Sequence, residues 1–173
     1  RVKKLSNTKN VYIPYGGDNA KENKFENSNA PNINNLIKRD YFFKVCRIEP
    51  ENNIHVVIKA AIEAKVSLVI VGNWSNSDYG KKLKNYYSSK VYKKIFLLDP
   101  IYDPDELGAL RSNCISYVHG HTVGGTNPSL VEAMSLGLDI ICQKNVYNQY
   151  TTDFKATYFS DLKELVEILK YKN

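Results

Sequence analysis

Apolar and polar residues follow one another in blocks along the chain, and the blocks predict strands and helices in turn. Short apolar runs such as SLVIVG (67–72) and CISYVHG (114–120) are typical of strands that are covered on both faces. Other segments, such as residues 51–64, repeat apolar side chains at the three-to-four-residue spacing of a helix. From Tyr41 onward the chain therefore predicts alternating strands and helices.

The same pattern gives the expected bounds of the elements. Strands are expected at 41–48, 67–72, 94–99, 114–120, 138–143 and 156–159. Helices are expected at 51–64, through 83–89, and at 104–113, 128–137 and 161–170. Strand–helix alternation of this kind produces parallel strands joined by right-handed helical crossovers. The predicted fold class is α/β, a doubly wound, Rossmann-like parallel sheet.

The first forty residues differ from the rest and divide the chain into two parts. VYIPYGGD (11–18) predicts a short strand that ends in a Gly-Gly turn, and residues 19–35 are polar and Asn-rich with little to bury. We expect residues 1–40 to be an entry strand with a polar loop, and residues 41–173 to be the Rossmann-like domain. In such sheets ligands bind beyond the carboxyl ends of the strands.

Composition and charge narrow the classes of partner. The 173 residues suit a single domain, and 24 Lys and Arg against 18 Asp and Glu give a net charge of +6. The basic residues are scattered rather than gathered in one stripe with aromatics, so nucleic acid is not an expected partner. A modest basic excess is compatible with anionic small molecules or with an anionic membrane surface.

The chain lacks the sequence patterns of a membrane-spanning segment and of a signal peptide, and its cysteines indicate reduced thiols. No apolar run approaches the ~20 residues that cross a bilayer, and the chain starts at Arg1 without a signal-peptide pattern. Cys46, Cys114 and Cys142 are odd in number and lie in apolar stretches, which indicates buried, reduced thiols. We therefore expect a piece of a longer cytoplasmic protein.

The segment HGHTVGGTNPSLVEAMSLG (119–137) carries the most chemical information. Asn127 is a preferred N-cap and Pro128 a preferred first helical residue, so a helix start is predicted there. Gly124 and Gly125 would let backbone amides approach a ligand, and Thr126 adds a hydroxyl. Together with the positive end of the helix dipole, these groups predict a phosphate site.

A carboxylate inside that helix extends the prediction to a nucleotide. Glu132 lies about a turn into the helix, where it could accept hydrogen bonds from two ribose hydroxyls. The competing interpretation is structural, because glycines before helices are common and an early helical Glu is often a solvated residue. The glycines do not follow the first strand of a dinucleotide fingerprint, so NAD is not expected.

His119 and His121 flank Gly120 and would point the same way from an extended strand. A metal site needs further ligands, and no carboxylate or cysteine stands beside them, so no metal is predicted. A contact with phosphate or sugar is the alternative, with His119 the favoured residue of the two.

These motifs resemble the C-terminal, donor-binding domain of the retaining GT-B glycosyltransferases of family 4, and most closely its bacterial rhamnosyltransferase branch. The likeness rests on VCRIEPENN (45–53), LVIVGN (68–73), the stretch 95–118, and VEAMSLG (131–137), which occur in the family's order and spacing. It covers most of the chain.

The resemblance implies roles for individual residues. It assigns the donor diphosphate to Arg47 and to the loop Gly124, Gly125, Thr126 and Asn127, and the ribose to Glu132. It places base or sugar contacts at Pro100, Ile101 and His119. Arg47 could instead pair with Glu49 or Glu51 on the surface.

Two departures from the family pattern concern charge. The family's phosphate-binding Lys falls at Asn52, and the first of its two glutamates falls at Gly124 or Val123, neither of which is acidic. A donor held mainly by backbone amides, with a deoxy sugar such as rhamnose, is compatible with both departures. No catalytic residue is assigned within these 173 residues.

The resemblance further implies transfer of a hexosyl unit, with rhamnosyl the best expectation, from a dTDP-, UDP- or GDP-linked sugar with retention. The acceptor would be a glycan or lipid-linked molecule in polysaccharide biosynthesis, with no cofactor required. The acceptor domain would lie N-terminal to this chain and could rest on the inner membrane face. This chain is not expected to be active alone. The alternatives are a nucleotide-sugar epimerase domain and a non-catalytic nucleotide-binding module.

Overall fold

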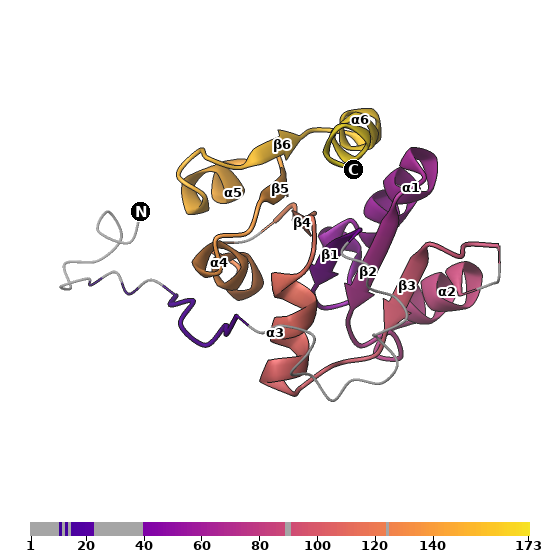
Figure 1. Ribbon diagram of the computed structural model, residues 1–173, viewed down its shortest axis with the longest axis horizontal. Helices are drawn as coiled ribbons and strands as arrows, with labels where there is room; N and C mark the ends of the chain where they lie inside the picture. The colour runs from indigo at the N-terminus through magenta and orange to yellow at the C-terminus, as the bar shows by residue number, and fades with distance from the viewer. Residues whose placement is uncertain (1–10, 12, 14, 23–39, 89–90, 124) are drawn as a thin grey trace, which may run out of the picture.

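The computed structural model of the chain describes residues 11, 13, 15–22, 40–88, 91–123 and 125–173. Within these ranges it is a six-stranded sheet between two layers of helices (Figure 1). Every strand pair is parallel, and the strand order is β3-β2-β1-β4-β5-β6. This is the predicted doubly wound, Rossmann-like sheet.

The strands are β1 (Tyr41–Val45), β2 (Ser67–Val71), β3 (Ile95–Leu98), β4 (Ser116–His119), β5 (Ile140–Gln143) and β6 (Thr157–Phe159). The helices are α1 (Ile54–Ala64), α2 (Asp78–Tyr87), α3 (Pro104–Ser112), α4 (Pro128–Ser135), α5 (Val146–Thr151) and α6 (Leu162–Lys172), with a 3-10 turn at Pro50–Asn52. All six predicted strands from residue 41 onward are present. They are shorter at one or both ends than the apolar runs that predicted them.

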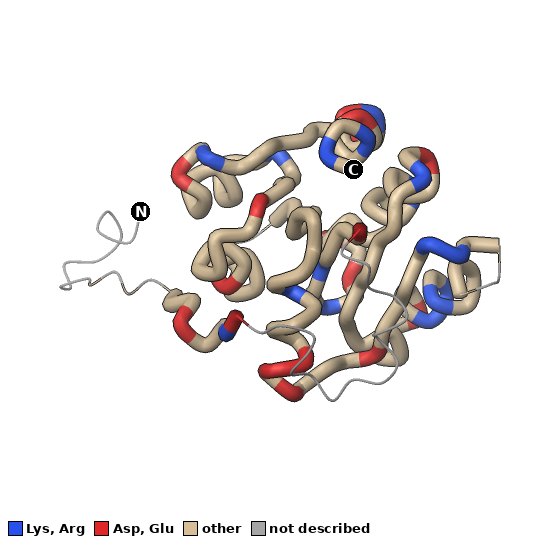
Figure 2. Tube along the Cα trace, viewed as in Figure 1, with Lys and Arg blue, Asp and Glu red and all other residues tan. Residues whose placement is uncertain are grey.

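Side chains on each face of the sheet form a separate apolar cluster. One cluster joins alternate strand residues such as Phe42, Leu68 and Val118 to α1 and α6. The other joins Phe43 and Tyr117 to α3 and α4. Both faces of the central strands are thus covered, which explains why those strands read as continuous apolar runs. Most charged residues lie on the outer helices and loops (Figure 2).

Two predictions near the ends of the chain need correction. In the segment 11–18, where a strand was expected, none of the described residues is in a strand, and Val11 and Ile13 are 74% and 84% exposed. Helix α5 was not predicted, because its sequence VYNQYT places no apolar stripe at helical spacing. The side chain of its N-cap, Asn145, accepts a hydrogen bond from the Asn148 amide instead. Most of the predicted Asn-rich loop lies outside the described residues.

Candidate functional site

The carboxyl ends of β1 and β4 form the centre of the candidate site. The chain leaves β1 toward β2 on one side and leaves β4 toward β5 on the other, so the connections diverge between these two strands. A crevice at such a switch point is where doubly wound sheets bind ligands. The turn after β1, the loop after β4 and the start of α4 all meet at this edge.

The start of α4 is built as its sequence predicts. The Asn127 side chain accepts a hydrogen bond from the Ser129 amide at 3.0 Å, and Pro128 occupies the first turn. Gly125 and Thr126 precede the cap, whereas Gly124 lies outside the described residues. The phosphate role expected of Gly124, Gly125, Thr126 and Asn127 stays a prediction.

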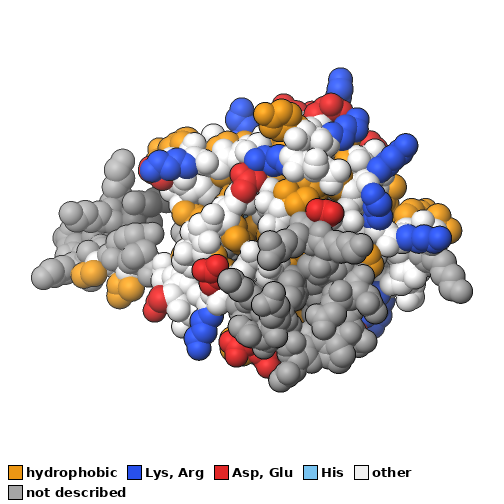
Figure 3. Space-filling model, viewed as in Figure 1, with side chains coloured by type: hydrophobic (Ala, Val, Ile, Leu, Met, Phe, Trp, Pro, Cys, Tyr) orange, Lys and Arg blue, Asp and Glu red, His pale blue; other side chains and the backbone are white. Residues whose placement is uncertain are grey.

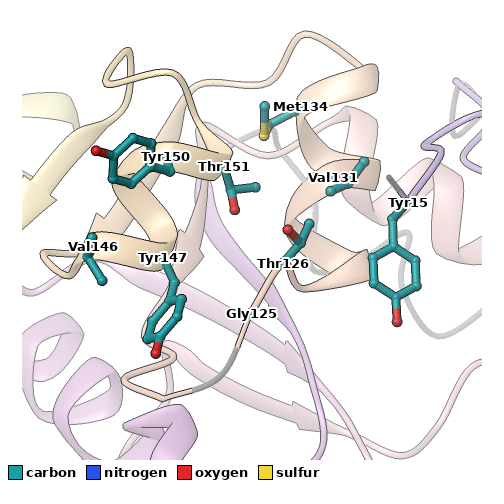
Figure 4. A pocket seen from close by; sticks show the side chains of 9 residues that line it. All are labelled: Tyr15, Gly125, Thr126, Val131, Met134, Val146, Tyr147, Tyr150 and Thr151. Carbon is teal, nitrogen blue, oxygen red and sulfur yellow. The ribbon is translucent and has the colours of Figure 1, made fainter. Parts of the chain in front are cut away.

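Beside this helix start lies a cavity of about 500 Å³. Figure 4 shows Gly125 and Thr126 on one side of it, Tyr147 and Tyr150 of α5 on another, and Tyr15 at the far end. The remaining lining residues are Val131, Met134, Val146 and Thr151. None of the nine carries a charge, so the cavity favours a neutral ligand group with apolar and hydroxyl surfaces.

Arg47 follows β1, and its side chain is exposed at the same edge. Within the described ranges its guanidinium forms no ion pair, so the expected alternative of a pair with Glu49 or Glu51 is not observed. Its backbone carbonyl accepts a hydrogen bond from Asn52 Nδ2 at 3.0 Å. The turn therefore holds Arg47 in place and leaves its charge available.

Asn52 stands where the resembled family has a lysine, and here it joins two loops. Its side chain is buried, and its Oδ1 lies 2.8 Å from Nδ1 of His121. Next to it, the Thr122 amide and hydroxyl both donate to the Glu51 carbonyl. A Cβ on Gly120 would lie 2.6 Å from the Asn52 carbonyl oxygen, so only glycine fits there. These contacts clamp the turn after β1 to the loop after β4.

His119 and His121 point the same way, as predicted, with ring centroids 5.9 Å apart and nearly parallel. The two differ in exposure, because His119 is 2% exposed whereas His121 is half-buried. Burial is the main cause that lowers the pKa of each ring, so both are neutral near pH 7. Of the pair, His121 is the more accessible to a ligand, although the sequence favoured His119.

Glu132 is held by a partner that the sequence did not reveal. Arg111 of α3 donates from Nη2 to Glu132 Oε2 at 2.7 Å, and the exposed side-chain fractions are 4% and 26%. The carboxylate therefore lies between α3 and α4 rather than being a freely solvated helix residue. Its predicted ribose role would use the second oxygen and stays a prediction.

The predicted base contacts follow β3. Pro100 and Ile101 are both half-buried, and Ile101 packs against the apolar cluster that contains α3 and α4. Asp99, just before them, pairs with Lys84 at 2.6 Å. The segment lies at the same edge of the sheet as Arg47, and no contact tests its predicted role.

Lys44 is a residue of this region that sequence reasoning did not select. It lies within β1 and is wholly buried. The available signal was its position in YFFKV, where a charged residue interrupts an otherwise apolar strand.

The cysteines of the domain are reduced and lie apart from one another. All three thiols are free, and burial raises the pKa of Cys142 to about 12, so that thiol stays protonated. In the described part of the chain, no three His, Cys, Asp or Glu side chains converge as a metal site would require. No helix in the described ranges is long and apolar enough to span a bilayer.

Comparison with solved structures finds the same fold in glycosyltransferases. HepE from Anabaena, solved in complex with UDP, matches with a TM-score of 0.73 and 17% identity, over 93% of this chain and 46% of that one. The C-terminal domain of LpcC, a glycosyl transferase group 1 family protein from Francisella tularensis, matches with a TM-score of 0.66 and 18% identity, over 91% and 87%. The pneumococcal O-GlcNAc transferase GtfA, in complex with UDP and GlcNAc, matches with a TM-score of 0.58 and 19% identity, over 76% and 28%.

The chain thus spans less than half the length of HepE and nearly all of the LpcC domain. A search of curated protein sequences finds no significant match. The family comparison is decisive, because residues 25–152, well over half of the chain, match the family described as glycosyl transferases group 1. The chain belongs to the glycosyl transferases group 1 family, and its domain has the Rossmann-like fold of one half of a GT-B glycosyltransferase.

Proposed function

We propose that this domain binds the nucleotide-sugar donor of a glycosyltransferase and that the full protein moves a hexosyl unit from that donor to an acceptor. The observation that carries the proposal is the guanidinium of Arg47, which is exposed and forms no ion pair with any described residue, at the edge of the sheet where α4 begins. A guanidinium and a helix N-terminus each attract the oxygens of a diphosphate. The UDP in HepE and in GtfA is consistent with a ligand of this class.

We place the parts of the donor on separate surfaces of the site. The diphosphate would lie at Arg47, Thr126 and the start of α4, and the ribose at Glu132. Its base would lie by Pro100 and Ile101. The uncharged cavity beside Gly125 would take the sugar, and its apolar lining suits a deoxyhexose such as rhamnose.

The reaction we propose is hexosyl transfer with retention to a glycan or lipid-linked acceptor, in the cytoplasm or at the inner membrane face. Negative charge that develops on the leaving diphosphate would be stabilised by Arg47, by the loop amides and by the α4 dipole. On the face seen in Figure 3, Lys and Arg side chains are interspersed with Asp and Glu rather than gathered into one patch. We place the membrane contact in the acceptor domain, outside this chain.

Calorimetric titration of the 173-residue chain with UDP-, dTDP- and GDP-sugars tests the donor class. We expect at least one to bind, and Arg47→Ala to weaken UDP by about tenfold or more, because a charge-assisted contact contributes about 1.5–3 kcal/mol. Uridine, which has no phosphate, should lose much less. Lys82→Ala, which removes an exposed charge on α2, is the matched control and should leave UDP binding unchanged.

Two results would contradict the proposal. Absence of binding by every nucleotide and nucleotide sugar would remove the donor role. Equal weakening of UDP and uridine by Arg47→Ala would remove Arg47 from the diphosphate.

A further inference from the structure

Among the buried side-chain nitrogen atoms that lack a hydrogen-bond partner within the described residues, two lie at the carboxyl ends of the central strands. They are Nζ of Lys44 in β1 and Nε2 of His119 in β4. Lys44 is 0% exposed and His119 is 2% exposed. Buried polar atoms are nearly always paired, and a buried amine without a partner is costly to keep charged. A pair of such atoms on adjacent central strands therefore requires an explanation.

Both residues lie where the two central strands separate. β1 and β4 pair through Phe42 with Ser116 and through Phe43 with Tyr117. Lys44 and His119 come after these pairs, toward the carboxyl edge. This is the switch point of the sheet, where a ligand would enter.

The groups around Lys44 include no carboxylate that would hold its charge. Its charge interacts with Cys46 after β1, with Cys142 of β5, and with His119 and His121 at the end of β4. Side chains alternate along a strand, so Lys44 shares the face of Phe42, which α1 and α6 cover. Neither helix supplies a group that shifts the pKa of Lys44. Arg47 and Glu51 act on His121, and neither shifts the pKa of Lys44.

An anion at the edge would shift the balance between the neutral and the charged form of Lys44. Burial lowers the pKa of Lys44, which favours the neutral amine while the site holds no anion. A diphosphate would bring negative charge to a region of low effective dielectric, where charge attraction acts over several ångströms without direct contact. Such an anion raises the pKa of a nearby amine.

We propose that Lys44 is a buried, proton-linked counter-charge for the donor diphosphate, taking up a proton when the nucleotide binds at the carboxyl edges of β1 and β4. The proton comes from solvent and converts the neutral amine to the ammonium, while the diphosphate keeps its own charge. This inference rests on the proposed function. It explains how a site with asparagine at position 52 gains a second positive charge beside Arg47 only when an anion is present.

Proton uptake can be measured directly on the 173-residue chain. UDP is titrated by calorimetry at about pH 8.5 in two non-phosphate buffers of different ionisation enthalpy, a pH at which UDP is fully ionised and histidines are neutral. We expect uptake of a measurable fraction of a proton, up to about one per UDP, and an affinity that falls as pH rises. Uridine should bind without proton uptake, because it brings no charge.

Substitutions test whether Lys44 is the residue that takes up the proton when UDP binds. Lys44→Met should abolish the uptake and weaken UDP by about tenfold, the effect of one pKa unit. His119→Phe should keep the uptake at this pH, and Lys59→Met, which removes an exposed charge on α1, should resemble the unchanged chain. The measurement on the unchanged chain stands by itself if Lys44→Met fails to fold.

The outcomes separate this inference from the proposed function. If UDP binds with no proton exchange, or if Lys44→Met binds UDP with the same uptake, the inference is wrong and the donor site stands. If the unchanged chain binds no nucleotide, the proposed function fails and the inference falls with it.

Discussion

In the described part of this domain, two cationic side chains, Arg111 and Lys44, are buried on opposite faces of the sheet, and only Arg111 has a counter-ion. Arg111, between α3 and α4, is 4% exposed and donates to the Glu132 carboxylate at 2.7 Å. Lys44, within β1, is 0% exposed and has no partner for its amine in the described part of the chain. A guanidinium stays charged under all ordinary conditions and so needs a permanent counter-ion, whereas an amine can lose its proton. Arg111 is thus a permanent charge that holds α3 and α4 together, whereas the charge of Lys44 depends, by the inference above, on the bound ligand.

The largest expected effect comes from removing the partner of Arg111. Glu132→Ala leaves a buried guanidinium without a counter-charge, and we expect it to lower the free energy of unfolding by about 2–3 kcal/mol, since Glu132 is itself partly exposed. Urea denaturation at neutral pH measures the loss. Glu63→Ala, which truncates an exposed glutamate on α1, is the matched control and should change stability by less than about 0.5 kcal/mol. A loss for Glu132→Ala no greater than the control's would show that the ion pair contributes nothing.

Replacing Lys44 is expected to raise the free energy of unfolding rather than lower it. Lys44→Met keeps an unbranched side chain of similar length and removes the unpaired amine, so it should raise the free energy of unfolding by about 1–3 kcal/mol. The folded pKa lies below the unfolded value, so the penalty is absent above pH 10.5 and grows as pH falls below that value. The gain in the variant should therefore shrink as pH approaches 10.5. Destabilisation by Lys44→Met at neutral pH would point instead to a packing role, and Lys59→Met gives the baseline.

The smallest expected effect is a loss of stability on acidification that depends on His119. Burial and the neighbouring Lys44 and His121 lower its pKa well below 6.5, so the unfolded chain binds more protons than the folded chain below that pH. Stability should be full above pH 6.5 and fall as pH drops toward the lowered pKa, by up to about 1.4 kcal/mol per pH unit. His119→Phe should flatten this slope in thermal or urea unfolding. A slope that persists unchanged would assign it to His55 and His121, whose pKa values are also lowered.

The sequence predicted the parts of the candidate site that depend on local structure and missed a contact between distant segments. Asn127 and Pro128 specify the start of α4 by local hydrogen bonding and backbone restriction, and the structure has them in those roles. Arg47 was placed at the end of the first strand by order along the chain, and it is exposed there. By contrast, the partner of Glu132 lies 21 residues away on another helix, and no local pattern joins Arg111 to it.

The helices also differ in how far the sequence predicts them. The helix α6 shows an apolar stripe and an Asp161 cap, and the sequence predicts it within a few residues. The helix α5 has no such stripe, and its position depends on Asn145 and Asn148, whose side-chain amides donate to the backbone carbonyl of His121. Those bonds exist only after β4 and β5 are side by side.

The sequence by itself determined the alternation of strands and helices, the class of the sheet and the start of α4. These features depend on periodicity and on capping between near neighbours, which are properties of short segments. The tertiary structure alone decided that Lys44 is buried with no partner among the described residues, that Arg111 holds Glu132 and that Asn52 bonds to His121. It also decided which of two neighbouring histidines is the more exposed. Burial and charge pairing depend on which segments, distant along the chain, meet across the sheet. The spacing of residues within any one segment does not contain that information.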